Sequence, residues 1–181
     1  MSEIVNMNEA GIDEEKDYVE DEEMIVRLLS SPKLYDTDTC RLNAAAFNLR
    51  ILRGKNETYV SLGRERDMDN GLSGYLERMP NIIWGKSRTQ DYVGYIRSEA
   101  AEYRKDFPLN ALFSVLEGSD DHAGLFFLTG DKQQCLAGPI DKSNADELKY
   151  YLAILELCER LEPFVILNVF TNISPSQSPF Y

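Results

Sequence analysis

The sequence contains one histidine, His122, and three cysteines, Cys40, Cys135 and Cys158, in 181 residues. The cysteines are far apart and form no C-x-x-C pair, and a lone histidine cannot complete a two-histidine metal centre. These shortages exclude a four-ligand zinc site made of cysteine pairs or histidine pairs. We therefore expect reduced thiols, no metal site and no cofactor.

Long apolar runs are also missing. Runs such as FVIL at 164–167 are much shorter than the roughly 20 residues that span a bilayer. The first fifteen residues lack the basic start and the apolar stretch of a signal peptide. We expect a cytoplasmic protein that has no membrane partner.

Several common catalytic motifs are absent. The chain has no G-x-x-x-x-G-K-[ST], no G-x-G-x-x-G, no H-E-x-x-H and no G-x-S-x-G. Phosphate-loop, dinucleotide-fold, zinc-protease and hydrolase-elbow enzymes therefore find no support in the sequence. Any prediction of function must therefore rest on the charge distribution and on local sequence patterns.

The net charge of −12 is concentrated at one end of the chain. Residues 1–23 hold ten acidic residues and a single lysine, a net charge of −9, so the other 158 residues carry only −3. Residues 41–105 hold twelve basic and eight acidic residues, a net charge of +4. The sequence thus joins an acidic arm to a mildly basic middle.

The arm has too few apolar residues to offset the entropy lost when a chain becomes ordered. We predict a disordered acidic arm at 1–22, a single globular domain at 23–170 and a loose tail at 171–181, which is rich in proline and serine. The arm is the predicted surface for a basic protein partner. Its predicted partner-binding residues are Asp13, Glu14, Glu15, Asp17, Glu20, Asp21, Glu22 and Glu23. A solubility tail, and an arm that folds back on the basic middle, are the alternatives.

Hydrophobic patterns in the globular region predict an α+β fold. MIVRLL at 24–29, a hairpin of 110–117 with 123–129, and FVILNVF at 164–170 have the pattern of strands. Helices are predicted from about 67 to 79 and from Ser143 to Pro163, and 91–107 suits a helix or a strand that leads into one. We expect a mostly antiparallel sheet with two or three helices on one face.

His122 follows Asp120 and Asp121 at the start of an apolar run. This trio could act as a histidine base oriented by a carboxylate, or bind a cation. The same residues are also ordinary turn formers whose short side chains bond to their own backbone. Both interpretations stay open at this point.

Arg27 and Ser61 are polar residues on predicted strands. Together with a glutamate such as Glu99 or Glu117, they resemble the arrangement in ADP-ribosyltransferase folds, although the acidic signature of those enzymes is missing. The resemblance implies an enzyme that holds a dinucleotide. The alternative catalytic set, for a nucleotide- or nucleic-acid-directed enzyme of this or another kind, is His122, Asp121, Arg27 and Ser61.

A wider resemblance covers about half the chain. The segments RLLSSPKLYD, LNAAAF, ETYVSLGRE and DDHAGLFF are similar in order to those of uncharacterised small bacterial proteins from genomic islands. No known active site comes with this resemblance.

Aromatic and basic residues alternate between residues 75 and 105. The rings of Tyr75, Trp84, Tyr92, Tyr95 and Tyr103 lie among the cations of Arg78, Lys86, Arg88, Arg97 and Arg104. Such alternation could bind single-stranded nucleic acid, although a net charge of +4 is modest for that role.

The favoured prediction is a non-catalytic interaction module that recruits a basic partner, and a nucleotide- or nucleic-acid-directed enzyme is the alternative.

Overall fold

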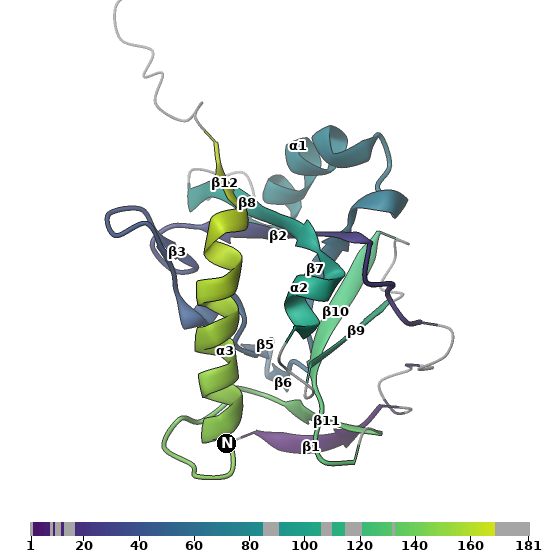
Figure 1. Ribbon diagram of the computed structural model, residues 1–181, viewed down its shortest axis with the longest axis vertical. Coiled ribbons are helices and arrows are strands. Elements are labelled where there is room, and N and C mark those ends of the chain that lie inside the picture. Colours follow the sequence, from purple (N-terminus) through teal and green to yellow (C-terminus); the bar gives the residue numbers. More distant parts are fainter. Residues whose placement is uncertain are drawn as a thin grey trace, which may run out of the picture.

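A six-stranded antiparallel sheet forms the centre of the protein (Figure 1). The computed structural model describes residues 2–7, 9, 12, 17–84, 91–105, 110–114, 121–131 and 133–168. The strands of this sheet, in spatial order, are β12 (Val165–Leu167), β8 (Tyr92–Glu99), β2 (Met24–Ser30), β7 (Val60–Arg64), β10 (His122–Phe127) and β9 (Asn110–Ser114).

Shorter elements surround this sheet. The strand pairs are β1 (Glu3–Asn6) with β11 (Gln134–Ala137), β3 (Tyr35–Asp36) with β4 (Arg41–Leu42), and β5 (Ile51–Leu52) with β6 (Lys55–Asn56). Single 3-10 turns lie at η1 (Ala44–Ala46), η2 (Glu65–Asp67) and η4 (Glu162–Phe164). Every strand pair within the described residues is antiparallel, which confirms the predicted α+β class.

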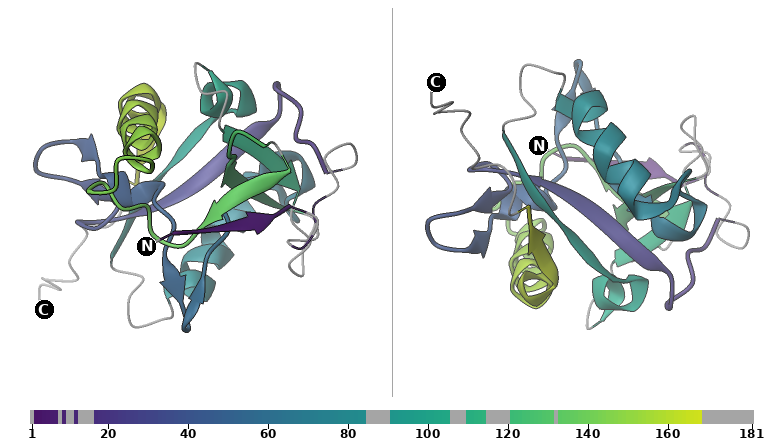
Figure 2. Two further views of the ribbon diagram at one scale, coloured as in Figure 1. Left: turned by 90° about the horizontal axis from the view of Figure 1, so that it is seen from below. Right: turned by 90° about the horizontal axis from the view of Figure 1, so that it is seen from above.

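Helices cover both faces of the sheet, so the prediction of helices on one face is wrong. Helix α1 (Gly71–Trp84) lies on one side of the long strands, and α2 (Ala100–Arg104) and α3 (Leu148–Leu161) lie on the other (Figure 2). Strand β2 shows the reason, because Ile25 and Leu29 pack in the core beside α3 while Val26 and Leu28 pack against α1. A strand that is apolar on both faces must be covered on both.

The described part of the acidic arm is folded, which corrects the prediction of disorder for those residues. Strand β1 pairs with β11, placing Ile4 opposite Leu136. Met7 and Ile12 are buried in a small cluster with Phe126, and Val19 lies in the main core. A few scattered apolar side chains therefore suffice, because Met7, Ile12 and Val19 dock into the body of the protein. Asp13, Glu14 and Glu15 lie outside the described residues, as does the predicted loose tail.

Ion pairs join the end of the acidic arm to the basic middle. The Glu23 carboxylate accepts hydrogen bonds from the Arg64 guanidinium at 2.8–3.0 Å, and both side chains are more than nine-tenths buried. Arg104 donates to the Asp21 carboxylate and to the Val19 carbonyl, and its guanidinium lies 4.3 Å from the centre of the Tyr18 ring. The arm therefore neutralises part of the basic middle within the same chain.

Replacing Arg64 tests how much the buried Glu23–Arg64 ion pair stabilises the fold. Arg64→Ala should lower the free energy of unfolding by about 3 kcal/mol, because the Glu23 carboxylate is left buried without its main partner. Arg66→Ala is the control, since Arg66 also contacts Glu23 but its side chain is 59% exposed. It should cost less than about 1 kcal/mol in the same urea titration. Equal losses would show that burial of the pair is unimportant.

Candidate functional site

Ser61 and His122 meet on the face of the sheet that α1 covers. Strands β7 and β10 pair with His122 opposite Gly63 and with Ser61 opposite Gly124. The two polar side chains are therefore diagonal neighbours on one face. The Ser61 Oγ lies 2.5 Å from His122 Nε2, and both residues are half-buried. A hydroxyl at this distance from an imidazole nitrogen has the geometry of a nucleophile and its base.

Gly63 and Gly124 complete this part of the sheet and let two tyrosines approach it. A Cβ at Gly63 would lie 2.7 Å from the Tyr75 hydroxyl, and a Cβ at Gly124 would lie 2.9 Å from the Tyr59 ring. Any larger residue would force these rings away. The Tyr59 ring also meets the His122 ring edge to face, with centroids 6.3 Å apart. The tyrosines thus border the Ser61–His122 pair on both sides.

Tyr75 stays protonated at this site. Burial raises the pKa of its hydroxyl to about 12, and the nearby Asp121 carboxylate acts in the same direction. Tyr75 comes from α1 and packs with Val26 and Leu28 of β2. Its hydroxyl is therefore a fixed neutral group beside the two polar side chains.

Asp121 immediately precedes β10, and both its backbone and its side chain accept hydrogen bonds. Its carbonyl accepts the backbone N–H of Arg64 at 2.7 Å, and its buried carboxylate receives the Arg78 guanidinium at 3.2 Å. Arg78 lies on α1, and its side chain is 43% exposed. Asp121 and Arg78 therefore pair a buried anion with a partly exposed cation at the residue before His122.

Arg27 occupies a different position from the one that its proposed role requires. Arg27 lies two residues from both Ile25 and Leu29 along β2, so its side chain shares their α3 face. There it donates to the Ser61 carbonyl at 2.8 Å and to the Ala46 carbonyl at 3.1 Å. Burial lowers its pKa to about 10, so the guanidinium remains charged at neutral pH. Arg27 positions the backbone at Ser61 and does not face the serine hydroxyl.

Of the two glutamates in the suggested transferase arrangement, the structure describes only Glu99. Glu117 lies outside the described residues, and Glu99 lies at the end of β8 opposite Met24. Within the described ranges, no group of three or more histidine, cysteine or acidic side chains could hold a metal ion. Burial raises the pKa of the Cys135 thiol to about 11 and that of Cys158 to about 12. These two cysteines are therefore protonated thiols in the core.

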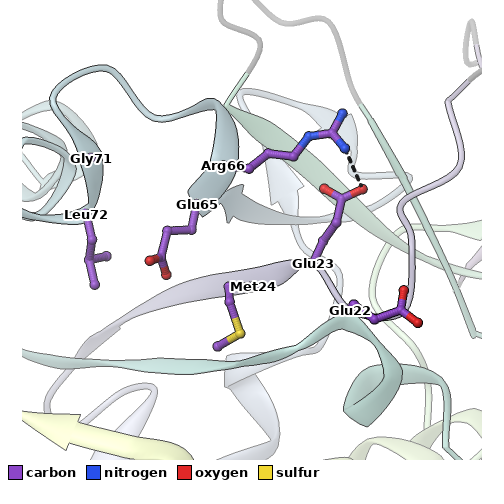
Figure 3. A pocket seen from close by; sticks show the side chains of 7 residues that line it. All are labelled: Glu22, Glu23, Met24, Glu65, Arg66, Gly71 and Leu72. Carbon is purple, nitrogen blue, oxygen red and sulfur yellow. Dashed lines mark hydrogen bonds and ion pairs between the residues drawn. The ribbon is translucent and has the colours of Figure 1, made fainter.

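The end of the acidic arm lines a pocket of about 470 Å³ (Figure 3). The pocket is formed by Glu22, Glu23, Met24, Glu65, Arg66, Gly71 and Leu72. Glu23 faces Arg66 across it, and Glu65 pairs with Arg97 of β8 at 2.6 Å. Its carboxylates are therefore largely paired, and Glu22 is the exposed acid on its rim.

The other predicted partner-binding residues differ in exposure. Among those described, Glu20, Asp21 and Glu22 are exposed, Asp17 is half-buried and the Glu23 side chain is buried. Three rings of the alternating aromatic stretch present little stacking surface, since Tyr75, Tyr92 and Tyr103 are each at most 7% exposed. Lys86 and Arg88 lie outside the described residues. These three rings are unavailable to the bases of a nucleic acid.

Comparison with protein families, curated proteins and solved structures found no match. The resemblance to genomic-island proteins therefore stays a prediction, as does the cytoplasmic location. No helix in the described portion of the chain is both long and apolar enough to cross a membrane.

Sequence reasoning singled out Ser61, His122 and Asp121, which the structure brings close together. It named Tyr75 and Arg78 only in the aromatic and basic stretch, and it did not name Tyr59. A signal for the tyrosines was present, because Gly63 and Gly124 interrupt apolar strands and such glycines often mark a close approach. What approaches them depends on the placement of α1 and on the strand register. Neither can be read from a single sequence.

The close approach at Gly63 can be tested by adding one methyl group. Gly63→Ala should lower the free energy of unfolding by about 1–3 kcal/mol, because the new Cβ overlaps Tyr75 and Met68. Gly130→Ala is the matched control, since a Cβ there meets nothing within 4 Å. Thermal and urea denaturation measure both variants. An unchanged Gly63→Ala protein would mean that the tyrosine does not lie on this strand.

Proposed function

We propose that this protein is a group-transfer enzyme in which Ser61 is the nucleophile and His122 is its general base. The observation that carries the proposal is the 2.5 Å distance between Ser61 Oγ and His122 Nε2. A hydroxyl is a weak nucleophile at neutral pH and gains strength when a base removes its proton during attack. The neutral Tyr75 and the buried Asp121 carboxylate, paired with Arg78, supply a fixed polar surrounding.

The proposed substrate is a phosphate ester of the nucleotide class. Ser61 Oγ forms a bond to phosphorus while the bond from phosphorus to the leaving oxygen breaks. The serine proton passes to His122 Nε2 and then to the leaving oxygen. Water then attacks the phosphoserine with the same imidazole as base, and Ser61 leaves and regains a proton.

Two neighbours favour a nucleotide. The Arg78 guanidinium is 43% exposed and pairs with Asp121, the residue before His122, and guanidinium groups bind phosphate oxygens well. The half-buried Tyr59 ring borders His122 and offers an aromatic surface to a base. We therefore expect Arg78 to contact the phosphate and Tyr59 to contact the base.

Labelling with a fluorophosphonate tests the nucleophile directly. The reagent should phosphonylate Ser61, which intact-mass and peptide mass spectrometry would locate. Ser61→Ala should lose the label, and His122→Ala should slow labelling at least about 100-fold because the base is gone. Labelling should also slow in acid, since a protonated imidazole cannot accept the serine proton.

Ser143→Ala provides the control, because Ser143 is an exposed serine bonded to Asp141. It should label like the unmodified protein. Absence of an adduct on Ser61, or equal labelling of His122→Ala, would contradict the catalytic role. ATP should protect Ser61 from the reagent, whereas adenosine should protect it poorly. Failure of every nucleoside triphosphate and of NAD to protect would contradict the nucleotide class alone.

Recruitment of a basic protein partner is the second candidate function. It is favoured by the exposed Glu20, Asp21 and Glu22 beside the carboxylate-lined pocket. An incoming arginine or lysine would compete with the exposed Arg66 for Glu23, while its aliphatic part contacts Met24 and Leu72. This function needs no chemistry at Ser61.

A charge-reversal pair tests this second function. Binding of a fluorescent deca-arginine peptide, followed by anisotropy, should weaken about tenfold or more in Glu20→Lys/Glu22→Lys and should fall with added salt. Asp38→Lys/Asp146→Lys is the control, because it makes the same change in net charge at exposed positions far along the sequence. Equal weakening in both variants would show that only net charge matters and would contradict a defined acidic site.

A further inference from the structure

Helix α3 exposes a stripe of three leucines. Leu148, Leu152 and Leu155 are 40%, 49% and 38% exposed, although the opposite side of the same helix is buried in the core. Spacings of four and three residues place the three side chains on one narrow face. This is the a/d spacing of helices that pack against each other in a coiled coil.

We infer that this stripe is the contact surface for a second copy of the chain, with the two α3 helices packed antiparallel. A two-fold axis beside Leu152 would place Leu152 on its own counterpart. It would place Leu148 of each copy opposite Leu155 of the other, because these residues lie four positions before and three after the centre. The stripe is therefore self-complementary, as an interface between identical copies requires.

The charges beside the stripe agree with the antiparallel arrangement. Lys149 and Glu156 are exposed and lie on the same flank of α3, since they are seven residues apart. Lys149 lies three residues before Leu152 and Glu156 lies four after it. In the antiparallel pair each Lys149 therefore comes opposite Glu156 of the other copy. A parallel pair would place these flanks on opposite sides of the interface.

The interface is small and its affinity should be correspondingly modest. Three leucine layers along a 14-residue helix bury less than the typical stable interface. The net charge of −12 on each copy also opposes association. We expect a dimer that dissociates in the micromolar range.

Sedimentation equilibrium of the full chain tests this inference. The mass should rise from 20.7 kDa toward twice that value as the concentration increases. Leu152→Glu should keep the protein monomeric, because it places two carboxylates against each other at the centre. Lys149→Glu and Glu156→Lys should each weaken the dimer, and the double variant should restore it. Circular dichroism checks that each variant folds.

Leu167→Glu is the matched control, because Leu167 is 40% exposed on the edge strand β12 and lies outside the stripe. It should leave dimerisation unchanged. A monomer at all concentrations would overturn the inference. So would a dimer that survives Leu152→Glu, or one that Leu167→Glu dissociates, since the latter would indicate pairing through the sheet edge. Failure of the charge exchange to restore association would overturn the antiparallel arrangement.

Discussion

The close contact of Tyr59 and Tyr75 with two strand glycines determines what the α1 face of the sheet can hold. Because Gly63 and Gly124 carry no side chains, the two rings lie directly on the strands and leave Ser61 and His122 as the polar side chains between them. The Tyr59 ring packs edge to face against the imidazole. A 2.5 Å contact between a hydroxyl and an imidazole is therefore supported by packing on both sides.

The opposite face of the sheet contributes through the backbone. The half-buried Arg27 guanidinium donates a hydrogen bond to the Ser61 carbonyl from the α3 side, so the strand that carries the nucleophile is held from behind. At the other end of β7, Arg64 pairs with Glu23 and its N–H binds the Asp121 carbonyl. The end of the acidic arm and the proposed catalytic pair are thus connected through one strand. One acidic residue near the N-terminus, Glu23, is therefore part of the fold, because it pairs with the buried Arg64.

Local patterns predicted the elements better than their arrangement. The strand at 24–29, the hairpin of β9 with β10 and the helix that ends at Leu161 follow from periodicity and turn residues. The last strand is apolar in sequence, yet Ile166 lies exposed at the sheet edge, because the order of strands depends on long-range pairing. For the same reason, the sequence did not reveal that the described part of the acidic arm is folded. Met7 and Val19 become favourable only when the distant surfaces they cover are present.

The single histidine makes one measurement decisive for the proposed catalytic pair. In protein labelled with ¹⁵N-histidine, the two ring nitrogens of His122 give the only imidazole signals. If Ser61 donates its hydroxyl proton to Nε2, the neutral ring carries its own proton on Nδ1, and the Nε2 signal should shift in Ser61→Ala. A ring that carries its proton on Nε2, with signals unchanged in Ser61→Ala, would contradict the assignment of His122 as the base for Ser61.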